Sequence, residues 1–130
     1  MSLLSKREIL EAHDLGHKDI EVPEWGGTVR IKRITALERD EFERENSKKN
    51  KNGEQEMAMD NFRARYCSFV MVDETGERLF SPADVEDLGA KSGKALQRIF
   101  TVAMDLNGIG VAELEALTKN SEPGLSDDSA

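Results

Sequence analysis

Residues 18–34 read KDIEVPEWGGTVRIKRI and carry the strongest structural signal in the chain. Apolar and polar residues alternate on both sides of residues 23–27, as they do in strands that bury one face. Gly26 and Gly27 can adopt the positive φ angles that a tight turn needs. We therefore expect an antiparallel β-hairpin, with Arg30 and Lys32 in water. The side chains expected on its buried face are Ile20, Val22, Val29 and Ile31.

Most of the other apolar residues follow helical spacing. Ser5 and Thr35 are each followed three residues later by a glutamate, a capping box that marks a helix start. Apolar residues then recur every three or four positions in two longer stretches, which we expect to be the core helices. A hairpin is marginal alone, so it must lie on these helices or on a further strand, to which residues 78–80 can contribute. The predicted helices cover residues 6–12, 36–46, 54–72, 82–89, 94–107 and 111–117.

The predicted fold class is α+β, a mainly helical single domain with a small antiparallel β-hairpin near the N-terminus. The length of 130 residues is that of one domain, which we place at residues 1–119. Residues 120–130 hold serine, glycine, proline and acids, so a flexible, disordered acidic tail is expected there. Residues 47–53, SKKNKNG, are polar and cationic and lack an apolar anchor, which predicts a loop.

The formal net charge is −8 and the isoelectric point is near 4.8, which argues against nucleic acid as a partner. Residues 73–130 carry 5 Lys or Arg against 12 Asp or Glu, a net −7, whereas residues 1–72 carry 13 against 14. A basic partner surface would be attracted to the second half. The chain lacks an apolar run of about 18 residues, so no membrane span is expected. Its single cysteine suits a reducing compartment, and we expect a cytoplasmic protein.

Few residues suggest chemistry. His13 and His17 are four positions apart, but Gly16 interrupts the helix and the His-Glu-x-x-His arrangement is missing. Cys67 lies on the most apolar helix without a histidine nearby, which favours a buried structural thiol over a nucleophile. The segment 108–110 has two glycines but lacks the third glycine of a dinucleotide-binding loop. We therefore expect no catalytic, cofactor-binding or metal-binding residues.

Binding to another protein is the remaining prediction. Trp25 is the only tryptophan, and at a hairpin turn it can anchor a partner or fold back onto the core. The cationic segment 47–53 offers a second contact surface. The candidate partner-binding residues are Trp25, Phe42, Lys48, Lys49 and Lys51.

Four segments also occur in a recognisable order. They are the hairpin at 20–31 with its VPEWGG turn, TALERDEF at 35–42, VDETGERLF at 72–80 followed by DVEDL at 84–88, and the stretch 96–108. In this order the chain resembles the tail assembly chaperones of siphophages, the lambda tail protein G-like family. The likeness covers roughly residues 4–120 and is strongest in the VPEWGG turn.

The resemblance implies a non-enzymatic chaperone, without cofactors, that works in the host cytoplasm. It would bind the tape measure protein, keep it soluble during tail tube assembly, and be missing from the mature virion. Members of the family are commonly also made in a longer, frameshifted form whose extra domain recruits the tail tube protein. Weak self-association is a further expectation, because many copies would cover one client. The alternative is a structural component of the phage head or tail that is retained in the virion.

Overall fold

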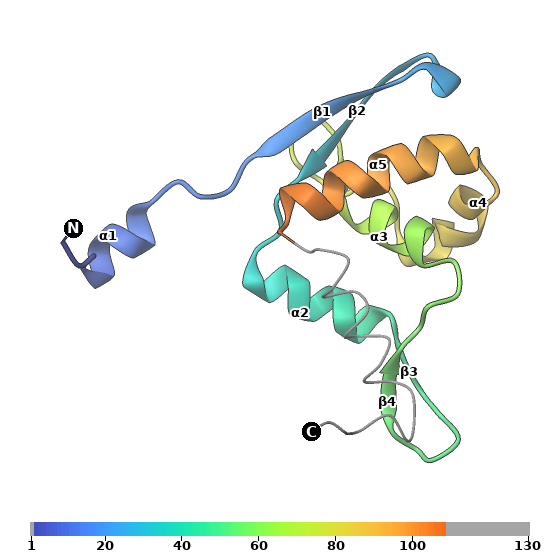
Figure 1. The fold of residues 1–130 in the computed structure, drawn as a ribbon, viewed down its shortest axis with the longest axis horizontal. Helices are drawn as coiled ribbons and strands as arrows, with labels where there is room; N and C mark the ends of the chain where they lie inside the picture. The colour runs from blue at the N-terminus through green and yellow to red at the C-terminus, as the bar shows by residue number, and fades with distance from the viewer. Residues whose placement is uncertain (1, 109–130) are drawn as a thin grey trace, which may run out of the picture.

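The computed structural model describes residues 2–108 (Figure 1). Helices and strands are mixed, with one three-stranded and one two-stranded antiparallel sheet, which confirms the α+β class. None of the described helices is long and apolar enough to cross a membrane. The elements are α1 (Lys6–Glu11), β1 (His17–Val22), η1 (Pro23–Trp25), β2 (Gly27–Lys32), α2 (Ala36–Glu45), β3 (Ser47–Lys49), β4 (Gln55–Met57), α3 (Phe62–Val70), β5 (Met71–Val72), η2 (Pro82–Asp84), α4 (Val85–Gly89) and α5 (Gly93–Leu106).

The predicted hairpin is formed by β1 and β2, which pair over their whole length from His17 opposite Lys32 to Val22 opposite Gly27. The turn between them is η1, and Gly26 closes it in the left-handed region at φ 72°. Three of the four residues expected on the buried face are buried, and Val29 is half-buried against the core. The alternation of the sequence therefore sets the register of this sheet.

Two cations of the hairpin are less exposed than expected. The guanidinium of Arg30 donates to both carboxylate oxygens of Asp19, the residue opposite it on β1, at 2.7 and 3.1 Å. The ammonium of Lys32 donates to Glu38 on α2 at 2.5 Å. Both side chains are half-buried in these pairs, so the prediction that they lie free in water is wrong.

A third strand supports the hairpin. β5 pairs with β2 through Met71 opposite Ile31 and Val72 opposite Arg30, and Val72 also bridges Arg78. The structure thus uses a further strand, as the marginal stability of an isolated hairpin requires. Its residues lie at the end of the stretch that was expected to be helical, immediately after α3.

Residues 47–57 differ from the prediction. The expected loop at 47–53 is the hairpin β3–β4, with Ser47 opposite Met57 and Lys49 opposite Gln55. The Asn50 side chain closes its turn by accepting hydrogen bonds from the backbone N–H groups of Asn52 and Glu54. Such side-chain bonds can replace the apolar anchor that the sequence lacks.

The expected helix at 54–72 is correspondingly shorter. It begins only at Phe62, because Asn61 precedes it in the left-handed region at φ 55° and residues 55–57 belong to β4. The helix 94–107 is confirmed as α5, with the Ser92 hydroxyl capping the Ala95 N–H. Helices at 6–12, 36–46 and 82–89 also correspond to observed elements. The predicted helix 111–117, the tail 120–130 and the domain boundary between them lie outside the described residues.

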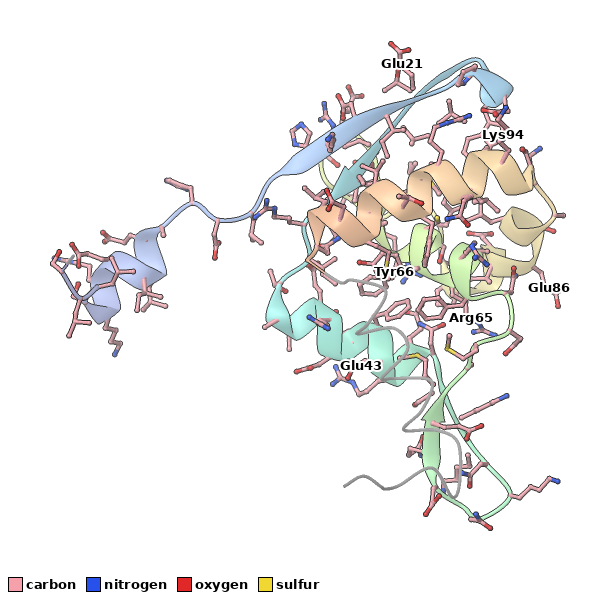
Figure 2. The ribbon with its side chains drawn as sticks, viewed as in Figure 1. Glu21, Glu43, Arg65, Tyr66, Glu86 and Lys94 are labelled. Carbon is pink, nitrogen blue, oxygen red and sulfur yellow. The ribbon has the colours of Figure 1, made fainter. Side chains whose placement is uncertain are left out.

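The core lies between the three-stranded sheet and the helices α2, α3, α4 and α5 (Figure 1). Its centre is an aromatic cluster in which Phe42, the one buried side chain of α2, meets the rings of α3 edge-on. Figure 2 shows Tyr66 inside the molecule, while Glu21, Glu43 and Glu86 point outward at its periphery. The two elements outside this body in Figure 1 are α1, at the end of an extended linker, and the hairpin β3–β4.

Candidate functional site

Trp25 is half-buried and packs against the core, so of its two expected positions the structure shows the folded-back one. The preceding residue holds it there: both carboxylate oxygens of Glu24 accept hydrogen bonds from Arg98 on α5, at 2.6 and 2.9 Å. These bonds, with help from a backbone bond, lower the pKa of Glu24 to about 2. The turn is thus tied to α5, and the role of Trp25 in binding stays a prediction.

Phe42 is only 4% exposed. Its ring centroid lies 5.9, 5.4 and 5.2 Å from those of Phe62, Tyr66 and Phe69, all in edge-on geometry. Edge-on aromatic pairs of this kind add about 0.5–1.5 kcal/mol each beyond the burial of area. In this conformation Phe42 holds α2 on α3 and is not part of an exposed surface, and its role in partner binding stays a prediction.

Lys48, Lys49 and Lys51 are exposed on the projecting hairpin β3–β4. The base of this hairpin is fixed by the buried Asn46, whose Nδ2 donates to the Phe42 carbonyl and whose Oδ1 accepts from Arg65. The three lysines therefore form a cationic tip on a defined base. Figure 1 places this tip and the η1 turn at opposite ends of the body, so the predicted binding residues do not form one cluster.

A hollow of about 450 Å³ opens between the start of α3 and the connection from α4 to α5. Its floor is apolar, and Arg63 and Lys91 give it a cationic rim without any lining carboxylate. The Arg63 guanidinium lies 5.5 Å from the Phe100 ring centroid and donates to Gln97, which fixes it over the floor. We call this the α3–α5 hollow, and its lining residues are Met59, Asn61, Phe62, Arg63, Ala64, Gly89, Lys91, Gly93, Leu96 and Phe100.

A second hollow, of about 350 Å³, is lined by all three strands of the sheet or the residues next to them. It has an apolar part formed by Val29, Val72 and the half-exposed Leu79, and Asp73 and Glu74 stand at its rim. We call it the sheet hollow. Its other lining residues are Thr28 and the paired Asp19 and Arg30.

Neither hollow was evident from the sequence, because each is lined by short segments from separate elements and these segments have no periodicity of their own. The available signals were single residues: a glycine at 89 against which Asn61 packs, and Leu79 directly after the charged Glu77 and Arg78. Isolated glycines and leucines of this kind also occur where a surface has no hollow. They indicate a binding surface only when the fold places them together.

The residues weighed for chemistry are dispersed. His13 and His17 are exposed, and residues 2–108 contain no group of three or more metal-ligating side chains. Cys67 is fully buried, and desolvation raises the pKa of its thiol to about 12. Because the thiolate is the nucleophilic form, this thiol is unreactive at neutral pH in the folded state. It therefore has the structural role expected from its helix.

Comparison with known proteins shows to which protein family the chain is similar. A family model described as phage tail assembly chaperone matches residues 5–120. Among solved structures, the chain is similar to that of the bacteriophage HK97 tail assembly chaperone, at 19% sequence identity and a TM-score of 0.48. That similarity covers 77% of this chain and 94% of the other. No curated protein matches the chain.

Proposed function

Because the chain belongs to the phage tail assembly chaperone family, as the match over residues 5–120 shows, we propose that its client is the tape measure protein. Membership gives a chaperone role in phage tail assembly. The proposal adds that the chain keeps the tape measure protein soluble in the host cytoplasm while tail tube subunits assemble. It acts by binding and not by catalysis, and it leaves the particle before the virion is complete.

The α3–α5 hollow is the observation that supports client binding most directly. Its floor contains Phe62, Leu96 and Phe100, which suit an apolar side chain projecting from a helix. Arg63 and Lys91 at the rim suit an acidic residue of the same helix. The net charge of −8 then keeps the complex in solution.

Co-expression with the tape measure protein tests this function. We expect the client to remain soluble and to co-purify with the chain. Gly93 lines the hollow, and a Cβ added there meets no atom within 4 Å, so Gly93→Phe is designed to place a ring in the hollow, with circular dichroism of the variant as the check that the fold is kept. Gly16 is equally open and lies outside both hollows, which makes Gly16→Phe the matched control.

The expected result is loss of most client capture with Gly93→Phe and normal capture with Gly16→Phe. If the unmodified chain neither binds the client nor prevents its aggregation, the proposed function is wrong. If Gly93→Phe captures as well as the unmodified chain, the client binds elsewhere, and the lysines of β3–β4 become the next surface to change.

A virion component is the second candidate, and mass spectrometry of purified particles separates the two. We expect peptides of the chain in lysates of infected cells and not in particles. An antibody against residues 2–108 would show in the same lysates whether a longer form exists, which would be the species that recruits the tail tube protein. Plaque yield unchanged by alanine at His13, His17 and Cys67 would support a non-enzymatic role.

Several copies on one long client would lie close together. We therefore include weak self-association in the proposal, since tethering to one client raises the effective concentration of neighbouring copies.

A further inference from the structure

The segment before β1 is an arm whose apolar side chains are not covered by any other part of residues 2–108. Helix α1 has no buried residue, and it stands apart from the body at the end of an extended linker (Figure 1). Two contacts fix the base of this linker: the Arg33 N–H donates to the Gly16 carbonyl, and the Arg33 side chain donates to the Asp14 carbonyl. Among residues 2–108, the large apolar side chains that are exposed are Leu3, Leu4, Ile9, Leu10, Leu15, Leu37 and Leu79.

A helix of this length needs a partner. Isolated helices shorter than about 12 residues are marginal in water, and α1 has six. Its capping box and the exposed Arg7–Glu11 pair contribute little by themselves. Leu4 and Ile9 occupy the positions of a hydrophobic staple, yet they are 69% and 57% exposed. The arm is thus built to fold against a surface that the rest of residues 2–108 does not provide in this conformation.

The arm as a whole carries Lys6 and Arg7 against Glu8, Glu11 and Asp14, so the charge of a single face of α1, and not that of the arm, discriminates between the two hollows. Lys6, Ile9 and Leu10 share one face of α1, because residues three and four apart are neighbours on a helix. This face therefore presents one cation beside two apolar side chains. The α3–α5 hollow has the cationic rim of Arg63 and Lys91, which would repel Lys6.

The sheet hollow has the complementary pattern. Leu79, one of the exposed leucines of the body, lines it, and Asp73 and Glu74 stand beside the apolar part. Asp19 at the same site is already paired with Arg30, and Asp73 accepts hydrogen bonds from the Thr75 N–H, the Thr75 hydroxyl and the Glu77 N–H. The exposed Glu74 is therefore the carboxylate most open to an incoming cation. If α1 lies against this hollow, Ile9 and Leu10 would meet the apolar part and the Lys6 ammonium would face Glu74.

We propose that α1 of one copy docks in the sheet hollow of a second copy, with Lys6 facing Glu74 and with Ile9 and Leu10 against Leu79. This inference rests on the self-association included in the proposed function and names its two surfaces. The contact is heterologous, since the arm and the hollow are different surfaces, so each copy can donate one arm and accept another.

Charge reversal tests the pairing on the purified chain alone, by sedimentation at increasing concentration. Lys6 and Glu74 are both exposed, so neither Lys6→Glu nor Glu74→Lys should disturb folding. Each single change is expected to weaken association about threefold to tenfold, and the double variant is expected to restore it, because it re-forms the pair with reversed signs. Ile9→Ser with Leu10→Ser should weaken association more than either charge change.

Disulfide trapping identifies the two surfaces directly, and the buried Cys67 does not interfere. A Lys6→Cys chain mixed with a Glu74→Cys chain should form a mixed disulfide under mild oxidation. Lys6→Cys mixed with Lys91→Cys, at the rim of the other hollow, should not. Both cysteines in one chain should link different molecules instead of closing within one.

The inference is overturned by a chain that stays monomeric at every concentration, by weakening that the double variant does not reverse, or by a disulfide that closes within one molecule. The last result would mean that the arm folds onto its own body. Because these measurements contain no tape measure protein, a negative result leaves client capture to its own test.

Discussion

Replacing Phe42 by alanine should strongly destabilise the domain, because the ring is buried among the aromatic side chains of α3. The side chain is 4% exposed, and an aromatic side chain buries about 150–250 Å². At about 25 cal/mol per Å² this area corresponds to about 4–6 kcal/mol, an upper estimate, since the unfolded chain is already partly compact. Measured Phe to Ala changes in cores cost about 3–5 kcal/mol, which is the loss we expect.

The loss expected for Phe42→Ala is large compared with the total free energy of unfolding of the domain. A domain of this size has a free energy of unfolding of about 5–15 kcal/mol. A loss of about 3–5 kcal/mol therefore removes from about a fifth to all of it. With a urea dependence of about 1.5 kcal/mol per molar, the midpoint of urea unfolding should fall by about 2–3 M. Circular dichroism at 222 nm follows the transition, because most of the helices depend on this core.

Leu37 supplies the matched control, since it lies on the same helix α2 but is 65% exposed. Leu37→Ala should change the free energy of unfolding by no more than about 0.5 kcal/mol. Phe42→Leu keeps an apolar side chain in the core, so its loss of unfolding free energy should lie between those of Phe42→Ala and Leu37→Ala. The reasoning fails if Phe42→Ala costs under about 1 kcal/mol, a value typical of surface positions. A loss of client capture together with such a small cost would return Phe42 to the binding surface.

Three further predictions follow from single contacts. An added Cβ at Gly89 would lie 2.5 Å from the Asn61 amide atoms, so Gly89→Ala should lower the free energy of unfolding by about 1–2 kcal/mol. This loss should disappear when Asn61 is also replaced by glycine. Additive losses for the two changes in urea unfolding would contradict the prediction. The pKa of Glu24 is lowered to about 2 in the folded state by Arg98, so its stabilisation is complete above its ordinary value near 4.5 and is lost as the pH falls toward 2. Unfolding of Glu24→Gln should therefore depend less on pH between 4.5 and 2 than that of the unmodified chain, and identical slopes would refute the pairing. Burial raises the pKa of Cys67 to about 12, so a thiol reagent at about pH 8 should label the chain only after urea unfolds it; fast labelling of the folded chain would show that the helix opens.

The sequence predicted those elements whose signal is local. The hairpin β1–β2 was predictable because alternation and two turn glycines lie within one short segment. Helix α5 was predictable because its apolar face repeats along its length. The family order of landmarks was also visible in the residues, and the family model confirms it.

The errors come from contacts between distant residues. The apolar spacing of α3 continues backward to Ala58, so it could not show that the helix begins at Phe62, where a left-handed Asn61 without a side-chain cap precedes it. Phe42 is one of two large apolar residues on the charged helix α2, and its immediate neighbours do not show that it is buried while Leu37 is exposed. The partners of Phe42, which are Phe62, Tyr66 and Phe69, follow at least twenty positions later, and only the fold brings them around it.

The same limit explains why the binding residues expected from the sequence and the hollows found in the structure differ. Sequence reasoning selects residues that are individually unusual, such as a single tryptophan or a run of lysines. A binding surface depends instead on charge and shape that several segments share, and here two such surfaces carry opposite rims: Arg63 and Lys91 at one, Asp73 and Glu74 at the other.

Because the rims of the two hollows carry charges of opposite sign, the chain can bind two different partners at once. The hollows have no lining residue in common, so occupation of one does not by itself block the other. The face of α1 with Lys6 is repelled by the cationic rim of the α3–α5 hollow and attracted by the acidic rim of the sheet hollow. An acidic client helix has the reverse preference. If both proposals hold, Gly93→Phe should abolish client capture and leave self-association intact, while Glu74→Lys should do the opposite. A variant at either hollow that impairs both activities equally would show that the two surfaces are not independent.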